Sequence, residues 1–312
     1  MKKYIGSLMV LMSGLMFSQS ILNASSPEEF RKMRDESMRK VGDTLVDKKI
    51  TPLSYGYVND EDIMKSVMVW EIIDLNDKLN QPYYYDNPAS LTSASAKSLY
   101  SVLLNAAYTG KITEVYDDEN FEMRLSAEQI QERLKDVRVS DEAINILNEG
   151  RALTDAERKA YTDIYETTTD KVRLIKVMGM WFIDKRDGMM KYRPLGIAAV
   201  GPDPKMIGRT GPNGELLSDQ DALIDLFWIY YPNAREVLAN SMVYNRMNAA
   251  SNMSFDDFLN ARRFSSVIYK SSNGIGDGKI SDYIPRNADE QLEESERIKA
   301  QILAMENEMW NY

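Results

Sequence analysis

Alternating apolar and polar positions predict the strands of this chain. Residues 67–73 alternate with a period of two, and two longer apolar runs, 172–183 and 192–200, flank the pair Asp187-Gly188. An Asp-Gly pair between two apolar runs is typical of a β-hairpin. Shorter strands are predicted at 55–58, 112–116, 223–231 and 266–270, and a further apolar run, 280–284, follows a glycine-rich turn.

Start and stop signals predict the helices. Residues 98–108 form a helical stretch that Gly110 closes, and the charged stretch 27–40 is also helical in pattern. Pro232 stands in the first turn of a helix that continues over 234–240. Residues 80–88 hold two prolines and are predicted to be an aromatic-rich loop. Caps predict further helix starts at Ser126 with Gln129, Ser140, Thr154 with Glu157, and Ser254 with Asp257.

The last predicted element is a long helix over 287–310. Its apolar positions fall on one stripe of an otherwise charged helix: Leu292, Ile298, Ile302, Met305 and Met309. A terminal helix becomes ordered by docking such a stripe. Two alternatives stay open, docking on its own subunit and docking on a neighbour or partner.

Strands and helices mix without a regular βαβ rhythm, which predicts an α+β fold. We expect a mixed, mainly antiparallel sheet with flanking helices and a long C-terminal helix. The expected organisation is a signal peptide at 1–18, an extended or helical arm at 19–52, a core at 53–286 and the helix at 287–312. A variable helical insertion is expected within the core at about 122–170.

The N-terminal pattern is that of a secretory signal. Lys2 and Lys3 precede an apolar run over 4–17, and Ser18 to Ser20 follow it. A bilayer span needs roughly 20 residues, so this run is short for an anchor. We expect cleavage near Ser18 or Ser20 and a mature protein in the periplasm, with an uncleaved anchor as the alternative.

Composition narrows the chemistry. The 312 residues contain no histidine and no cysteine, which excludes His-based nucleophilic triads and ordinary zinc, copper or haem ligation. The net charge of −10 becomes −12 once Lys2 and Lys3 leave, which disfavours nucleic acid and anionic lipid as partners. The 18 tyrosines and four tryptophans suit surfaces that become half-buried at interfaces.

Three motifs invite a chemical interpretation, and each is weak. The stretch 273–284 resembles a calcium loop, but Ile275 and Ile284 stand where oxygen ligands are required. Asp256-Asp257 and residues 117–119 are adjacent carboxylates. Neighbouring side chains on a helix diverge and do not face one another, so they make a poor acid–base pair. We therefore predict no catalytic residue, no cofactor and no metal.

Candidate partner-binding residues are aromatic, arginine and terminal-helix positions. Arg262-Arg263 beside Phe264 fits two interpretations equally, pairing with a partner's carboxylates and complementing a helix end with its local acids. The candidates are Tyr83, Tyr84, Tyr85, Trp228, Tyr230, Tyr231, Arg262, Arg263, Leu292, Ile298, Ile302 and Trp310.

Several runs together resemble one family. They are Trp70-Glu71-Ile72-Ile73-Asp74-Leu75-Asn76, the stretch 110–116, Trp181 to Arg186 leading into 192–197, Phe227 to Arg235, and Met253 to Ser266. The chain resembles the gliding motility family GldN, called PorN in non-gliding relatives. The resemblance extends from about Leu53 to Tyr312 and is weakest over 122–170.

The resemblance implies a non-enzymatic component of the type IX secretion system of Bacteroidetes. Its expected partners are a GldK/PorK-type outer-membrane lipoprotein, the periplasmic part of a GldM/PorM-type motor protein, and further copies in a ring. The mature chain is expected to lie in the periplasm without inserting into a membrane. Two other hypotheses stay open, a peptide- or glycan-binding module that uses Tyr83 to Tyr85 and a carboxylate-based hydrolase.

Overall fold

The computed structural model describes residues 50–85, 97–152, 154–211, 214–243, 253–272 and 278–309. All of them belong to one unit of the chain, Ile50–Pro88 with Ala96–Tyr312. The expected signal peptide, the predicted helix 27–40, the glycine-rich part of the calcium-like loop and Trp310 lie outside the described residues.

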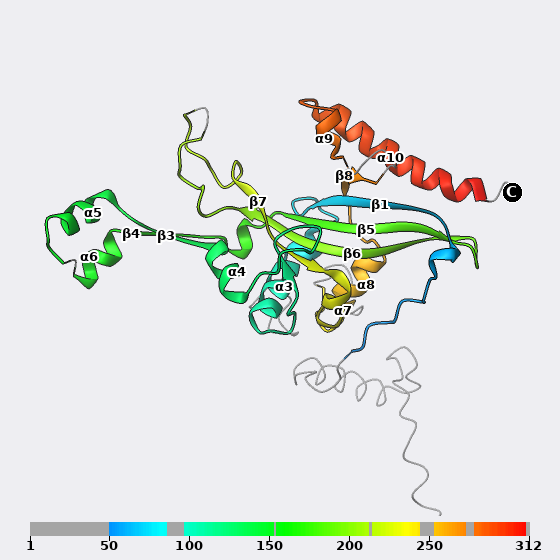
Figure 1. The fold of residues 1–312 in the computed structure, drawn as a ribbon, viewed down its shortest axis with the longest axis horizontal. Helices are drawn as coiled ribbons and strands as arrows, with labels where there is room; N and C mark the ends of the chain where they lie inside the picture. The colour runs from blue at the N-terminus through cyan, green and yellow to red at the C-terminus, as the bar shows by residue number, and fades with distance from the viewer. Residues whose placement is uncertain are drawn as a thin grey trace, which may run out of the picture. The chain divides into compact units, whose positions relative to one another are not determined.

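A six-stranded antiparallel sheet forms the centre of the fold, in the order β2-β7-β6-β5-β1-β8 (Figure 1). The strands β5 and β6 form the predicted hairpin, and Gly188 adopts the left-handed φ of 64° that its turn requires. The α+β prediction with a mainly antiparallel sheet is confirmed. The strands are β1 Ile63–Asp74, β2 Val115–Tyr116, β5 Leu174–Asp184, β6 Met189–Pro202, β7 Leu223–Tyr230 and β8 Val267–Ser271.

Helices begin at the predicted caps. Reciprocal capping boxes are present at Ser126, Thr154 and Ser254, and the Ser98 and Ser140 hydroxyls accept backbone N–H groups in the same way. Short 3₁₀ turns lie at Asp60–Asp62 and Thr169–Lys171. The helices are α2 Gln81–Tyr84, α3 Leu99–Tyr108, α4 Ala127–Leu134, α5 Asp141–Asn148, α6 Asp155–Ala160, α7 Tyr231–Ala239, α8 Phe255–Asn260, α9 Ile280–Tyr283 and α10 Ala288–Met309.

The main core lies between one face of the sheet and helices α3, α7 and α8. Alternate strand positions such as Ile73, Ile175 and Ile197 point to this side, as the period of two requires. Helix α3 contributes Leu99 and Leu103, which are fully buried. Because each buried aliphatic side chain stabilises by roughly 1.5–3 kcal/mol, this layer supplies most of the hydrophobic stabilisation.

The terminal helix α10 docks on its own subunit. Ile298 and Ile302 are buried against Val69 and Ile268. The backbone N–H of Ile268 donates to the Ser295 hydroxyl (2.9 Å). The Lys299 ammonium donates to the Ser266 carbonyl (2.7 Å). Helix α10 thus satisfies polar backbone groups of the edge strand β8, one of the known ways of protecting a sheet edge.

A second, two-stranded sheet lies within the expected helical insertion. Its strands β3, Lys135–Val139, and β4, Thr162–Glu166, pair antiparallel and flank α5 and α6 (Figure 1). The predicted helices of this region are present, but the strands were not predicted. Each strand is only five residues long and carries charges on both faces. The alternation of apolar and polar residues is therefore too weak to predict a strand.

Three local predictions were wrong. Residues 55–58 form no strand, because the carbonyls of Gly56 and Tyr57 accept side-chain hydrogen bonds from Arg193 and Arg186 in place of a strand partner. The run 280–284 includes the short helix α9, whose Ile280 packs beneath α10. Residues 81–84 are helical, with the proline tolerated in the first turn.

We predict that Ile298→Ala lowers the free energy of unfolding by about 2–5 kcal/mol, because it leaves a cavity between α10 and the sheet. Urea unfolding followed by circular dichroism measures the change. The matched control is Leu303→Ala on the same helix, because Leu303 is 61% exposed. Equal stability of the two variants would show that the docked stripe does not stabilise the subunit.

Candidate interaction surfaces

The three consecutive tyrosines do not form one surface. Tyr83 is 1% exposed and packs in the main core against the rings of Phe255, Phe258 and Phe264. Tyr84 is half-buried beneath the Arg173 guanidinium, and Tyr85 is exposed. A helical turn rotates each residue by about 100°, so neighbours on α2 necessarily face different environments. Only Tyr84 and Tyr85 are accessible to a partner.

The aromatic run at the end of β7 divides in the same way. Trp228 and Tyr231 are fully buried, whereas Tyr230 is exposed. Trp228 lies on the opposite side of the sheet from Phe227 and Ile229, as strand alternation requires. Of these candidates, Tyr230 remains available as a contact residue.

Arg262 forms a buried ion pair with Glu71 in the middle of β1. Its two terminal nitrogens donate to the two carboxylate oxygens at 2.8 Å each, and Ser266 donates to the same carboxylate (3.0 Å). Burial lowers the pKa of Arg262, but the hydrogen bonds and the charges of Glu71 and Tyr192 together outweigh it, and the net pKa is raised. Three rings surround the guanidinium, those of Trp181, Tyr192 and Phe264.

The other candidates have simpler positions. Arg263 is exposed and lies over the ring of Phe258. Ile298 and Ile302 are buried in the subunit, and Leu292 is exposed on α10. Of the two interpretations of Arg262-Arg263, pairing with a local acid is the one that applies to Arg262, and that acid is Glu71.

A second polar cluster lies beneath the segment 50–58. Arg235 of α7 holds Asp256 of α8 through two hydrogen bonds (3.0 and 2.9 Å), and the Tyr231 hydroxyl donates to the same carboxylate (2.8 Å). The ring of Tyr55 lies under the Arg235 guanidinium, 4.0 Å from its centroid, and its hydroxyl donates to Asn260 (2.5 Å). Asp256 therefore anchors two helices and the entering chain.

The remaining carboxylate candidates also have structural partners. Asp257 completes the cap of α8, Asp117 forms an ion pair with Arg133, and Glu119 forms one with Lys270 (2.7 Å). Among the described residues, no group of three or more acidic side chains could hold a metal ion. No helix in the described part of the chain is long and apolar enough to cross a bilayer.

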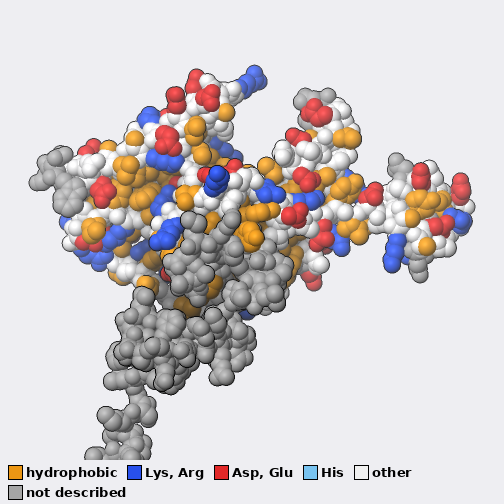
Figure 2. Space-filling view, turned by 180° about the vertical axis from the view of Figure 1, so that it is seen from behind, with side chains coloured by type: hydrophobic (Ala, Val, Ile, Leu, Met, Phe, Trp, Pro, Cys, Tyr) orange, Lys and Arg blue, Asp and Glu red, His pale blue; other side chains and the backbone are white. Residues whose placement is uncertain are grey.

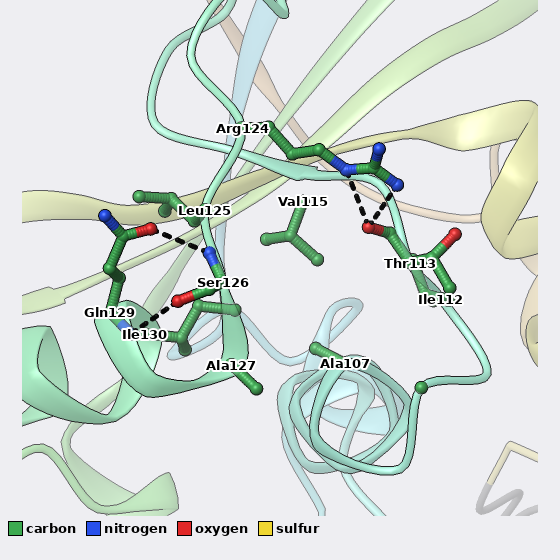
Figure 3. Close-up of a pocket in the computed structure, with 11 residues that line it drawn as sticks. Ala107, Ile112, Thr113, Val115, Arg124, Leu125, Ser126, Ala127, Gln129 and Ile130 are labelled. Atoms are coloured by element: carbon green, nitrogen blue, oxygen red, sulfur yellow. Dashed lines mark hydrogen bonds between the residues drawn. The ribbon is translucent and has the colours of Figure 1, made fainter.

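A shallow hollow of about 410 Å³ lies between α3 and α4 (Figure 3). Its floor is apolar, with Ile112, Val115 and Ile130 pointing inward. The Arg124 guanidinium at the rim is already bound, because its Nε and Nη2 both donate to the Thr113 carbonyl. The hollow fits an aliphatic side chain and offers no reactive group.

The sheet has a helix-free face opposite the main core. It comprises Trp70, Met178, Ala198 and Trp228, rimmed by Met68, Tyr116, Phe121, Leu195 and Tyr269. Every one of the six strands contributes, and no helix of the described chain does. Phe121, which adopts an unusual φ of 60°, lies against Gly196, where even a Cβ would approach its ring to 2.9 Å. This face was not predicted, although residues on both sides of the predicted strand 67–73 are mostly apolar.

The β3–β4 ribbon presents a second apolar face. Val137 and Ile164 are a cross-strand pair, 52% and 59% exposed, and Val139 lies on the same side. The other side is fastened to the loop after β6, because Arg138 stacks on Tyr165 and donates to the carbonyls of Pro204 and Ile207 (2.6 Å each). Helix α5 adds the exposed Ile144 and Leu147, and Figure 2 shows hydrophobic side chains at this tip.

The fold and these surfaces define an α+β domain that contains buried polar clusters and exposes several apolar patches. Residues 58–311 match the family model described as "Gliding motility associated protein GldN". This match covers most of the chain, which therefore belongs to the GldN family. A search of curated proteins gives no match.

We predict that Arg262→Ala destabilises the fold by about 3–5 kcal/mol, because it leaves Glu71 buried without its partner. Chemical denaturation measures the loss, and the exposed Arg263→Ala is the control. Arg262 has a φ of 49°, so Arg262→Gly tests whether backbone strain contributes. If Arg262→Gly has native stability, the ion pair is not the cause.

We predict a pH effect from Tyr55, whose pKa burial raises to about 12 against the opposing charge of Arg235. The unfolded chain loses this proton near pH 10 while the folded chain keeps it. Stability is therefore complete below about pH 10 and declines as the pH rises towards 12. In this window, Tyr55→Phe should remove the contribution of up to one proton from the slope of the unfolding free energy against pH. Identical slopes in the two proteins would contradict this prediction.

Proposed function

We propose that this chain is a non-enzymatic structural subunit of the periplasmic ring of the type IX secretion and gliding machinery. The observation that carries the proposal is the match of residues 58–311 to the GldN family. The chemistry of the described residues supports it. Glu71, which is buried in β1, and Asp256 and Glu119, which belong to the two carboxylate motifs, are each engaged by an arginine or a lysine.

A ring subunit needs at least one pair of different surfaces that bind between copies, together with surfaces for its partners. The described chain offers separate apolar features on the sheet, on the ribbon and at exposed Tyr85 and Tyr230. Exposed apolar patches of this kind are typical of protein–protein contact sites. They support assembly over a peptide- or glycan-binding module, because Tyr83 of the tyrosine run is buried.

The proposed partners are an outer-membrane lipoprotein of the GldK/PorK type and the periplasmic part of a GldM/PorM-type motor. The chain has no cysteine and so no acceptor for a lipid on that residue. Its attachment to the outer membrane is therefore proposed to run through the lipoprotein.

We predict that the tagged chain, purified from detergent-solubilised envelopes, elutes in a high-mass complex that contains both partners. In a strain that lacks the lipoprotein, the chain should move from the membrane pellet to the soluble periplasmic fraction. The control is the same strain with the lipoprotein restored. A lone monomer from wild-type envelopes, or unchanged pelleting without the lipoprotein, would refute the proposal.

A further inference from the structure

We propose that the surface beneath residues 50–58 is a peptide-binding site, and that in the assembled ring it takes this segment from a second copy of the chain. The ligand that it selects is an extended, uncharged segment that carries a tyrosine. The site itself is independent of the proposed function, whereas its filling by a second copy rests on that function, since the ring brings the copies together.

The first reason is that residues 50–58 are held as a bound peptide is held. In the described chain they form no backbone–backbone hydrogen bond. Their hydrogen bonds go instead to side chains that lie 129–205 positions further along the sequence. None of these contacts requires that the segment and the surface belong to one chain.

The backbone of the segment is recognised at both of its ends. The side-chain oxygen of Asn240 accepts the Ile50 N–H (2.8 Å), and the side-chain nitrogen of Asn240 donates to the Ile50 carbonyl (3.0 Å). At the other end, Arg193 and Arg186 donate to the carbonyls of residues 56 and 57 (2.9 and 2.8 Å). Contacts to backbone groups fix an extended course of the chain without reading its side chains.

Tyr55 supplies the sequence selectivity. The centroid of its ring lies 4.0 Å from Cζ of Arg235 and 4.8 Å from Cζ of Arg193. Its hydroxyl donates to the Asn260 side chain (2.5 Å). The side chain of Leu53, by contrast, is 85% exposed, so the site does not read it. The site therefore selects a tyrosine over a phenylalanine, which would leave the Asn260 oxygen without this donor.

The groups that hold the segment are kept in place by other parts of the fold. Arg235 is fixed by its two hydrogen bonds to Asp256, and Asn260 donates its side-chain nitrogen to the Asp256 carbonyl (2.8 Å). The Asn240 amide also donates to the Glu236 carbonyl within α7 (2.7 Å). Groups that are already oriented lose less conformational entropy on binding. The site is thus preorganised to receive a segment that arrives from outside.

The matching ligand is carried by the chain itself, which is why a second copy is the proposed occupant. Residues 59–62 join the segment to β1. The contacts are the same whether the segment and the site belong to one copy or to two, so exchange needs no new interface. In a ring, the segment of a neighbour is present at a high effective concentration. A lone chain fills its own site, and assembled copies exchange their segments.

A labelled peptide tests the site. The probe is a synthetic peptide of residues 50–59, added to the full chain with Tyr55→Ala and followed by fluorescence anisotropy. We expect binding at least about tenfold tighter than to the native chain, whose own segment competes with the peptide. Phenylalanine in place of the tyrosine at position 55 of the peptide should weaken binding about fivefold, because one hydrogen bond is lost.

A variant of the site provides the matched comparison. Within the described chain, Arg193 contacts the segment and the ring of Phe182. Adding Arg193→Ala to Tyr55→Ala should weaken peptide binding at least about tenfold. Adding Arg263→Ala makes the same charge change at an exposed position outside the site and should leave binding unchanged. Equal binding in these two variants, or no binding to Tyr55→Ala that retains the native circular dichroism spectrum, would overturn the site.

Exchange between copies is tested in cells, and the absence of native cysteine makes the test direct. Two full chains with different tags, one with Ile50→Cys and the other with Asn240→Cys, are coexpressed, and solubilised envelopes are treated with a short bismaleimide. A covalent product with both tags requires that the segment of one copy lies on the site of another. The control replaces the second chain by one with Leu303→Cys, an exposed position on α10.

We expect at least about tenfold more of the doubly tagged product from the matched pair than from the control pair. Because neither variant alters Tyr55, this test does not depend on the folding of Tyr55→Ala. Equal yields from the two pairs, in envelopes that contain the high-mass complex, would overturn exchange and leave the proposed function intact. If no high-mass complex forms, exchange and the proposed function fail together, and the peptide measurement still decides whether the site exists.

Discussion

A single buried carboxylate determines how the parts of this fold fit together. Glu71 lies in β1 between the apolar residues Trp70 and Ile72, and taking its charge out of water is costly unless donors surround it. Arg262 and Ser266 supply those donors, and both lie in the short connection between α8 and β8. The ion pair thus fixes where α8 ends and where β8 joins the sheet. Because α10 packs on β8, the position of the terminal helix depends on the same carboxylate.

The elements of the fold that local sequence determines could be predicted. The caps at Ser126, Thr154 and Ser254, the hairpin turn at Gly188 and the strand over 67–73 depend on neighbours in sequence, and all are present. Pro82 and the tyrosines after it indicated a loop, but α2 forms because Tyr83 fills a space between three phenylalanine rings. That space is made by residues about 170–180 positions further along the chain, which no local pattern contains.

The candidate surfaces were harder to predict, for a related reason. Aromatic and arginine residues are common both at interfaces and in polar clusters inside proteins, so their identity alone does not separate the two. Trp228 and Tyr231 are buried by neighbouring strands and helices, and Arg262 is held against Glu71 beneath three rings. Val137 and Ile164, by contrast, are ordinary strand residues that become notable only because the described chain leaves their face open. Exposure is decided by the tertiary fold, and it is exposure that makes a contact residue.

The hydroxyl of Ser295 has a consequence beyond the stability of α10. By accepting the Ile268 N–H, it occupies a group to which another polypeptide strand would otherwise add. A protein gathered in many copies at one place experiences a very high local concentration, under which strand addition leads to fibres of unlimited length. A helix that seals the last strand of the sheet removes this route. In the proposed ring, copies would then associate through faces whose geometry limits their number.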